Sequence, residues 1–428
     1  MSSTPAKAGK PKTGHRRRLD VVATAHAPVY VVWELTLACD HACTHCGSRA
    51  GVARDHELTT EEAIGVAGQL ADAGAREVIL IGGEAYLHDG FLDIVRALAG
   101  RGVTVGITTG GRGVTAELAV AMHAAGLRQA SVSVDGLEAT HDRMRHLKGS
   151  FAGTLRALAN LKAAGVAITA NTNLNRSNRD DLEPLYDVLR AQGVVAWQIQ
   201  LTAPLGRAAD RVLMILQPWD LLELVPRLAA LKQRARGDGI TIMPGNNLGY
   251  FGPEETVLRS LRAGDADHWR GCQAGKFVMG IESDGAVKGC PSLQTQHYVG
   301  GNLREQSLAT IWKDAPELGF NRARTVEDLW GFCKTCDFAA ECLGGCTFTA
   351  HSILGRPGNN PYCHYRARVH AKRGQRERLV PGAAADGLPF DNGVFEIVIE
   401  PLDAIDPGAE VTDLVQISRR PARRAVAD

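Results

Sequence analysis

The sequence predicts an α/β protein in which a partial (β/α)6 TIM-like barrel is followed by a small cysteine-rich domain. Two observations carry this prediction: strands and helices alternate regularly over the first half of the chain, and the ten cysteines fall into two separate groups. Three of the cysteines lie within residues 39–46, and the other seven lie between residues 272 and 363. With 428 residues, the chain is long enough for roughly two or three domains.

Six continuous apolar runs are typical of parallel strands that helices bury on both faces. We expect these strands at Tyr30–Leu37, Glu77–Ile81, Val103–Thr108, Gln129–Val134, Val166–Asn171 and Ala196–Leu201. The segments between them have helical periodicity, and several end at a glycine, the residue that commonly follows a helix. The expected helices are Thr59–Ala73, His88–Ala99, Thr115–Ala125, Ser150–Ala164 and Asp180–Ala191.

Successive strand–helix–strand units are right-handed, so they build a parallel sheet with helices on its outer face. Six units are fewer than the eight of a closed barrel, which predicts an open barrel whose chemistry lies at the C-terminal ends of its strands. We expect this barrel to cover residues 28–236 and to end with a helix at Trp219–Arg236.

The rest of the chain is divided by its composition. Residues 237–267 are rich in Gly, Pro and Asn and are predicted to connect the barrel to a cysteine-rich domain at residues 268–366. Residues 367–428 form a C-terminal extension with one clear strand, Val394–Ile399. Residues 1–27 are predicted to be a basic disordered tail, and residues 419–428 are basic as well. The alternative is that these tails help to hold an acidic partner.

Charge and hydropathy exclude several classes of protein. The chain has 48 basic and 47 acidic side chains, a net charge of +1, which is not that of a globally basic nucleic-acid binder. It has no run of about 18 apolar residues, and its N-terminus lacks the apolar segment of a secretory signal. We therefore expect a cytoplasmic protein with reduced thiols, no nucleic-acid partner and no membrane association.

The first cysteine group has CxxxCxxC spacing and directly follows the first predicted strand. Cys39, Cys43 and Cys46 can bind three irons of a cubane 4Fe–4S cluster and leave the fourth iron without a protein ligand. A metal with an open position can bind a substrate or cofactor. The alternative is a structural zinc site, although such sites use four protein ligands, commonly in paired CxxC units.

This loop resembles the hallmark of the radical S-adenosylmethionine (SAM) superfamily, whose members carry it on the first strand of a partial barrel. Gly82-Gly83-Glu84, at the end of the second strand, is similar to the GGE motif of that family. The resemblance implies that the glycines let the backbone approach the methionyl end of SAM, whose ammonium needs an acceptor. Ala85 replaces the proline that often follows this motif.

The resemblance also implies SAM contacts at the ends of later strands. These are Ser133 and Asp135, within Ser131–Gly136, with the ribose; Arg145 with the carboxylate; and Asn171, Asn173 and Leu201 near the adenine. Taken singly, each is equally compatible with an ordinary strand-end or core residue.

The chemistry of the family implies that SAM is cleaved reductively. An external one-electron donor of the flavodoxin or ferredoxin type reduces the cluster, and SAM yields methionine and a 5'-deoxyadenosyl radical. That radical abstracts a hydrogen atom from the substrate, while the protein orients the reactants and excludes competing reactions.

The seven later cysteines resemble the SPASM domain, the auxiliary-cluster extension of radical SAM enzymes, although zinc is the alternative for the CxxC half alone. The resemblance implies two auxiliary 4Fe–4S clusters. One would be held by four thiolates, those of Cys333, Cys336, Cys342 and Cys363. The other would be held by Cys272, Cys290 and Cys346. The second cluster would keep an open iron, because no further cysteine follows Cys272 closely.

SPASM enzymes with a GxxxxCP sequence, as at Cys290-Pro291, commonly act on ribosomally made peptides, which implies oxidative modification or crosslinking of a peptide. Sulfatase maturases have an aspartate where Pro291 stands, so formylglycine formation is disfavoured. An epimerase is disfavoured as well, because the clusters use all ten cysteines and leave no thiol as hydrogen donor. We expect no fused leader-binding domain, so a leader peptide would bind the barrel, the C-terminal region or a separate protein.

Two other functions stay open. The same radical chemistry could act on a small molecule in cofactor or antibiotic biosynthesis, and a short open reading frame beside the gene would favour the peptide instead. A non-catalytic iron–sulfur electron carrier would need neither Gly82-Gly83-Glu84 nor a SAM pocket. His41 and His45, in the first loop, are expected to be structural.

Overall fold

The computed structural model describes residues 26–406 and residue 408, so the two predicted basic tails lie almost wholly outside the described residues. Within the described part, no helix combines the length and the apolar composition that a membrane span requires.

A ten-stranded sheet forms the centre of the protein, in the order β10-β9-β8-β1-β2-β3-β4-β5-β6-β7. Six parallel neighbours confirm the six predicted strands: β1 (Tyr30–Glu34), β2 (Glu77–Ile81), β3 (Thr104–Thr109), β4 (Leu127–Ser133), β5 (Ala167–Leu174) and β6 (Ala196–Leu201). Because the strands are in register from one to the next, their C-terminal ends meet at one edge of the open barrel.

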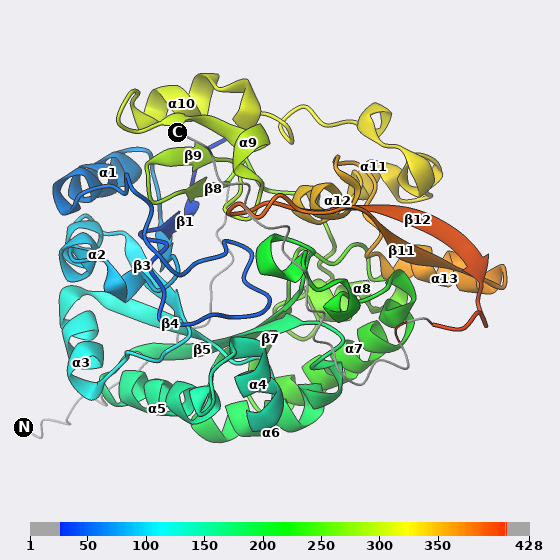
Figure 1. Ribbon diagram of the computed structural model, residues 1–428, viewed down its shortest axis with the longest axis horizontal. Coiled ribbons are helices and arrows are strands. Elements are labelled where there is room, and N and C mark those ends of the chain that lie inside the picture. Colours follow the sequence, from blue (N-terminus) through cyan, green and yellow to red (C-terminus); the bar gives the residue numbers. More distant parts are fainter. Residues whose placement is uncertain (1–25, 407, 409–428) are drawn as a thin grey trace, which may run out of the picture.

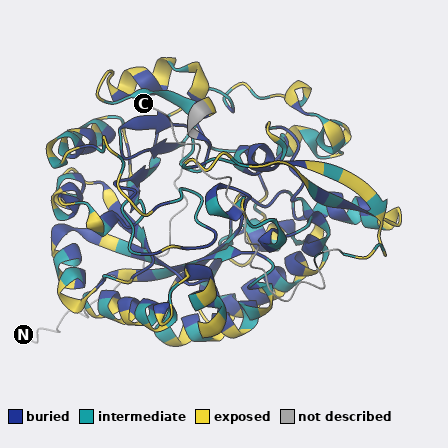
Figure 2. Ribbon diagram, viewed as in Figure 1, coloured by how far each residue is buried: buried dark blue, intermediate teal, exposed yellow. Residues whose placement is uncertain are grey.

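Helices cover the outer face of this sheet (Figure 1). They are α1 (Thr60–Asp72), α2 (Phe91–Ala99), α3 (Ala116–Ala125), α5 (Ser150–Ala163), α6 (Leu182–Gln192) and α7 (Leu221–Gly237). Local sequence explains their ends: a capping box of Thr59 and Glu62 begins α1, and Gly126, at a φ of 112°, ends α3. The strands are largely buried and the outer helix faces are exposed (Figure 2), which is the pattern expected of buried parallel strands.

The sheet extends beyond the six predicted strands on both sides. The segment at residues 237–267, expected only to connect, contributes β7 (Thr241–Pro244), parallel to β6, and α8 (Glu255–Arg259). On the other side β8 (Val278–Ile281) pairs in parallel with β1, and β9 (Ala286–Lys288) and β10 (Val299–Asn302) follow antiparallel. The cysteine-rich region therefore continues the barrel sheet.

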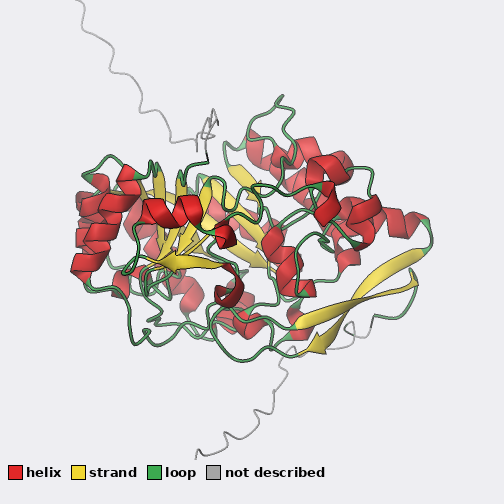
Figure 3. Ribbon diagram, turned by 90° about the horizontal axis from the view of Figure 1, so that it is seen from above, coloured by secondary structure: helices red, strands yellow, loops and turns green. Residues whose placement is uncertain are grey.

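Helix α4 (Glu138–Arg145), between β4 and α5, was not predicted from the sequence. The other helices and strands lie in or after the cysteine-rich region. They are α9 (Thr295–Tyr298), α10 (Leu308–Asp314), α11 (Ala339–Cys342), α12 (Thr347–Leu354) and α13 (His364–Lys372). Strands β11 (Gln375–Ala383) and β12 (Val394–Pro401) then form a hairpin apart from the main sheet (Figure 3). Strand β12 contains the predicted Val394–Ile399.

Candidate active site and metal centres

A cavity of about 300 Å³ lies at the C-terminal ends of the barrel strands, where barrels carry their sites. All three thiols of the CxxxCxxC loop belong to its wall. The ends of the later strands and of helix α4 add the predicted residues Gly82, Gly83, Glu84, Ser133, Arg145, Asn171, Asn173 and Leu201, and β3 adds Thr108 and Thr109. Asp135 lies behind the wall, fully buried. Residues from six different strand ends are thus brought together around the first cysteine group.

The two glycines of the GGE motif lie against the cluster loop. A Cβ on Gly82 would stand 2.3 Å from the carbonyl oxygen of Thr36, and one on Gly83 would stand 2.2 Å from that of Ala38 and 2.6 Å from the Cβ of Cys39. The Gly83 N–H donates to the Thr36 oxygen at 2.8 Å. The absence of side chains here is therefore what lets the cysteine loop pack on the end of β2.

Glu84 presents a buried carboxylate to the cavity. It accepts hydrogen bonds from the Thr109 hydroxyl at 2.5 Å and from the Gly110 N–H at 2.6 Å. Burial raises the pKa of Glu84 to about 7, although these two donors oppose the shift. A cationic ligand group at this position would favour the ionised carboxylate.

Arg145 and Asp135, which the sequence assigned to different parts of SAM, form a buried ion pair. Arg145 Nη2 lies 2.6 Å from Asp135 Oδ2, and His45 Nε2 lies 3.3 Å from the same oxygen. Burial alone would raise the pKa of Asp135, but Arg145 and His45 hold it well below its usual value. Arg145 Nη1 also donates to Cys43 Sγ at 3.6 Å, so its guanidinium reaches the cluster loop.

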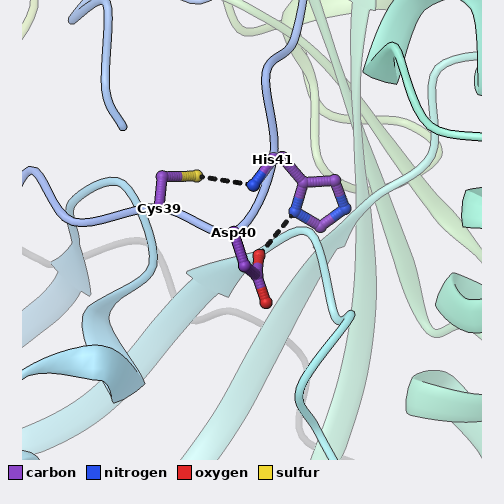
Figure 4. A group of neighbouring side chains, drawn as sticks. All are labelled: Cys39, Asp40 and His41. Atoms are coloured by element: carbon purple, nitrogen blue, oxygen red, sulfur yellow. Dashed lines mark hydrogen bonds and ion pairs between the residues drawn. The ribbon is translucent and has the colours of Figure 1, made fainter. Parts of the chain in front are cut away.

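The histidines of the cluster loop, expected to be merely structural, also belong to the cavity wall. His41 Nδ1 lies 2.8 Å from Asp40 Oδ1, and the His41 N–H donates to Cys39 Sγ at 3.4 Å (Figure 4). Ligand atoms of Cys39, Asp40 and His41 lie within 4.8 Å of one another, so this trio could also hold a single metal ion. Such an ion would take Cys39 away from the CxxxCxxC set. The one sequence feature that indicates this position is that both histidines stand between the cysteines of the CxxxCxxC motif.

Four of the later cysteines surround a second, smaller cavity of about 20 Å³. Its wall contains Cys333, Cys336, Cys342 and Cys363, the set implied for one auxiliary cluster. Burial raises the pKa of Cys363 to about 12, so its thiol must lose a proton to bind metal. A Cβ on Gly249 would stand 2.8 Å from the Cβ of Cys363, so glycine allows this segment to pack closely against Cys363. Four thiolates match the ligand set of an iron–sulfur cluster.

Cys272, Cys290 and Cys346 form a third group of thiols. Burial, together with the charge of the neighbouring Cys272 thiolate, raises the pKa of Cys290 to about 11 and that of Cys346 to about 12. These thiols therefore lie close enough to act on one another, as ligands of one cluster must. Ser292 and Phe348, each two residues after a cysteine of this group, line the first cavity. The chain that carries two of these thiols thus continues into the wall of the first cavity.

The tip of the β11–β12 hairpin reaches the same cavity, a contact that the sequence did not predict. Phe390 belongs to the wall, and its N–H donates to the Gly47 carbonyl at 3.1 Å. Arg49 Nε donates to Asp391 Oδ1 at 2.9 Å, and the Asp391 carbonyl accepts from the Gly206 N–H at 2.8 Å. The C-terminal extension is therefore fastened to the cluster loop and to the segment after β6.

Comparison with known proteins agrees with both groups of motifs. The radical SAM superfamily model matches residues 33–189, and the model of an iron–sulfur cluster-binding domain, SPASM, matches residues 272–337. The AdoMet-dependent heme synthase of Nitratidesulfovibrio vulgaris is 27% identical and covers 79% of this chain and 92% of its own. The mycofactocin maturase MftC of Mycobacterium tuberculosis H37Rv is 28% identical and covers 84% of this chain and 88% of its own.

Solved structures share the fold. Streptococcus suis SuiB bound to SAM superposes with a TM-score of 0.62 at 16% identity, over 79% of this chain and 76% of that one. Native anSMEcpe with bound AdoMet superposes with a TM-score of 0.63 at 16% identity, over 78% of this chain and 94% of that one. With its two domain matches and its parallel open barrel, the chain belongs to the radical SAM superfamily of iron–sulfur enzymes and carries a C-terminal SPASM domain.

Proposed function

We propose that the protein oxidatively modifies or crosslinks a ribosomally made peptide in the reducing cytoplasm. The observation that carries this proposal is the cavity shared by the CxxxCxxC loop and by Ser292 and Phe348, which adjoin the third thiol group. Bound there, a 4Fe–4S cluster and SAM supply a 5'-deoxyadenosyl radical when an external donor of the flavodoxin or ferredoxin type provides one electron.

The cavity residues divide the work of holding SAM. Glu84 would accept from the SAM ammonium, and Arg145, whose guanidinium is fixed through Asp135 and His45, would hold the SAM carboxylate. Asn171 Oδ1 is buried and has no hydrogen-bond partner among the described residues, so it is available to a donor of the adenosyl part. Ser133 and Leu201 complete this side of the wall.

The three thiol groups are proposed to hold three clusters. The four-thiolate set would supply a ligand to every iron of its cluster, whereas the set of Cys272, Cys290 and Cys346 would leave one iron without a cysteine ligand. An iron–sulfur cluster next to the substrate can take the electron that an oxidised product radical must lose. This arrangement supports an oxidation rather than an epimerisation, which would need a free thiol.

Two relatives support a peptide substrate, whereas the heme synthases support a small molecule. MftC is named a maturase, and SuiB has been solved bound to its precursor peptide SuiA. The heme synthases, at 27–29% identity, keep a second candidate open: the same radical chemistry on a small molecule. The discriminating observation is whether a peptide encoded beside the gene changes mass. A separate leader-binding protein would then be sought among the neighbouring genes.

Anaerobic reconstitution tests the proposed chemistry directly. We expect about twelve irons per chain, because three cubane clusters hold four each. With SAM and a reductant, the protein should form 5'-deoxyadenosine, and Cys43→Ala should form none. Mass spectrometry of a neighbouring peptide should show a loss of hydrogen or a crosslink. A count near four irons would contradict the auxiliary clusters, and 5'-deoxyadenosine from Cys43→Ala would contradict the site.

The raised pKa of Glu84 gives a pH-dependent prediction for the cofactor-free protein. A carboxyl whose folded pKa lies at about 7, against 4.5 when unfolded, favours folding at low pH and loses that advantage as the pH rises from 4.5 to 7. From pH 5 to 8, Glu84→Gln should therefore gain up to about 3 kcal/mol of unfolding free energy relative to the unsubstituted protein. Denaturant titration measures this difference, and added SAM should shrink it, because its ammonium favours the ionised carboxylate. A difference that is independent of pH would contradict the role of Glu84.

A further inference from the structure

Apart from its histidines and cysteines, the cavity wall contains three ionisable side chains, those of Glu84, Arg145 and Arg207. Glu84 is hydrogen-bonded by Thr109 and Gly110, and the charge of Arg145 is balanced by Asp135. Arg207 differs, because it has no acidic side chain within ion-pair distance in the part of the chain that the structure describes. A cation in a partly desolvated wall without an anion is unfavourable unless a ligand supplies one.

Hydrogen bonds to the cluster loop fix the guanidinium of Arg207. Its Nε donates to the Cys43 carbonyl at 2.7 Å and its Nη1 to the Ala50 carbonyl at 3.1 Å. Its backbone N–H donates to the Cys46 carbonyl at 2.9 Å. The third nitrogen, Nη2, is buried and has no hydrogen-bond partner among the described residues. The fork is therefore held in place with one donor nitrogen unused.

The backbone before Arg207 is shaped for this close approach. Gly206 has a φ of +56°, and a Cβ on it would stand 2.2 Å from the Gly47 carbonyl oxygen. Only glycine fits there without moving the loop, so the position of Arg207 against the cluster loop is built into the fold. Leu205 and Phe390, both in the cavity wall, add apolar surface from the same segment and from the hairpin tip.

Two carboxylates could meet Arg207, that of SAM and that of the substrate. The SAM carboxylate and ammonium are attached to one carbon, so both must lie near Glu84. The charges of Arg145 and Glu84 each shift the pKa of the other, which places them near one another, whereas Arg207 is fixed to the carbonyls of Cys43 and Ala50 instead. Arg145 therefore suits the SAM carboxylate, and Arg207 is left for a second anion.

We propose that Arg207 anchors a carboxylate of the substrate, with the apolar group next to that carboxylate packed on Leu205 and Phe390. Guanidinium suits this task because its unused Nη2 can donate a charge-assisted hydrogen bond to a carboxylate while the other nitrogens stay on the loop, and because it keeps its charge at all working pH values. The identity of the substrate rests on the proposed function. If the substrate is a peptide, the carboxylate is that of its C-terminus or of an Asp or Glu side chain.

The first experiment is independent of the peptide. The probe is phenylacetate, a carboxylate beside an apolar ring, and its neutral control is phenylacetamide; binding to the SAM-loaded, reconstituted protein is measured by saturation-transfer NMR. We expect phenylacetate to bind at least tenfold more tightly than the amide, because charge-assisted hydrogen bonds give roughly 10- to 100-fold discrimination. Arg207→Gln should remove this preference. Equal binding of acid and amide to the unsubstituted protein would overturn the proposal.

The controls separate a substrate anchor from a structural or SAM-binding residue. Arg112→Gln is the matched variant, because Arg112 also donates to a carbonyl of the cluster loop, that of Asp40, but lies outside the cavity wall. It should keep the preference for phenylacetate. Iron content and SAM affinity are measured for every variant, and a tenfold loss of SAM affinity in Arg207→Gln would overturn the proposal. If Arg207→Gln loses its first cluster, Arg207→Lys replaces it: it keeps the charge but lacks the fork, and its preference should fall at least threefold.

Peptides provide the second arm. For a peptide that the protein modifies, amidation of the C-terminus and Asp→Asn or Glu→Gln exchange are compared, and the exchange that raises KM at least tenfold identifies the source of the carboxylate. If neither exchange raises KM, the proposal fails. If no peptide is modified while phenylacetate binding still depends on Arg207, the peptide function fails and the anchor stands.

Discussion

Gly83→Ala is expected to abolish the first iron–sulfur cluster and leave the later cysteine groups able to bind theirs. The new Cβ would stand 2.2 Å from the Ala38 carbonyl oxygen and 2.6 Å from the Cβ of Cys39. Neither contact can be relieved by rotating a flexible side chain, because both neighbours belong to or adjoin the backbone of the cluster loop. The loop must therefore move off β2, which displaces Cys39 from the other two thiols.

Iron counting and 5'-deoxyadenosine formation measure this effect. We expect the iron content to fall by about four per chain, the content of one cubane cluster, and 5'-deoxyadenosine formation to fall at least 100-fold. Gly65→Ala is the matched control, because Gly65 lies in α1 and a Cβ added to it would meet nothing within 4 Å, so the same substitution there should keep all clusters. It should also stabilise the helix by about 0.5–1 kcal/mol. Full iron content in Gly83→Ala would show that the GGE glycines are needed for another reason.

The GGE motif, the barrel strands and the cysteine groups could be recognised in the sequence because each depends on a local pattern of residues. Six apolar runs of regular spacing predicted β1 to β6, and the cysteine spacing predicted one group of three thiols and a later group of seven. The resemblance to the SPASM domain implied how the seven divide, and the structure places the predicted set of four around one cavity. The sequence assigned the glycines to contact with SAM, and the structure adds their contact with Thr36 and Ala38. That contact depends on how two strand ends pack, which spacing alone does not reveal.

Short strands, a polar helix and contacts between residues far apart in the chain could not be predicted from the sequence. Strands β7 to β10 have three or four residues each, too few for a period to be recognised. Helix α4 is strongly polar, so it lacked the apolar stripe on which helix prediction depends. The contact of Arg49 with Asp391 joins residues 342 positions apart in the chain. No local sequence pattern indicates this contact. Because the contact was not predicted, neither was the position of Phe390 in the cavity wall.

This distant contact makes the C-terminal extension part of the active site. The hairpin is held at its tip by Arg49 and Gly206 and at its base by a buried ion pair between Glu377 of β11 and Arg366 of α13, and between these the Gln217 side chain exchanges two hydrogen bonds with the backbone of Leu379. Arg366 lies three residues after Cys363, so the base of the hairpin is fastened beside the four-thiolate group. One structural element thus connects the four-thiolate group with the first cavity.

Glu377→Ala should therefore loosen the whole hairpin. Glu377 accepts from Arg366 Nε and Nη2, both at 2.6 Å, and lies 3.3 Å from His370 Nε2. Removing the carboxylate leaves the Arg366 guanidinium buried without its anion, which typically costs about 3–5 kcal/mol. Stability in small domains is about 5–15 kcal/mol, so this loss is large enough to release the hairpin locally.

Hydrogen exchange with mass spectrometry should detect this release. In Glu377→Ala we expect at least tenfold faster exchange over residues 375–401, including the tip around Phe390, while strands β2 to β5 remain protected. Glu377→Gln should have a smaller effect, because the amide oxygen still accepts one hydrogen bond from Arg366. Glu396→Ala, at an exposed position of β12, is the control and should exchange like the unsubstituted protein. Faster exchange at the base with an unchanged tip would mean that Arg49 and Gly206 hold the tip alone, and the cavity would then be independent of the auxiliary cluster site.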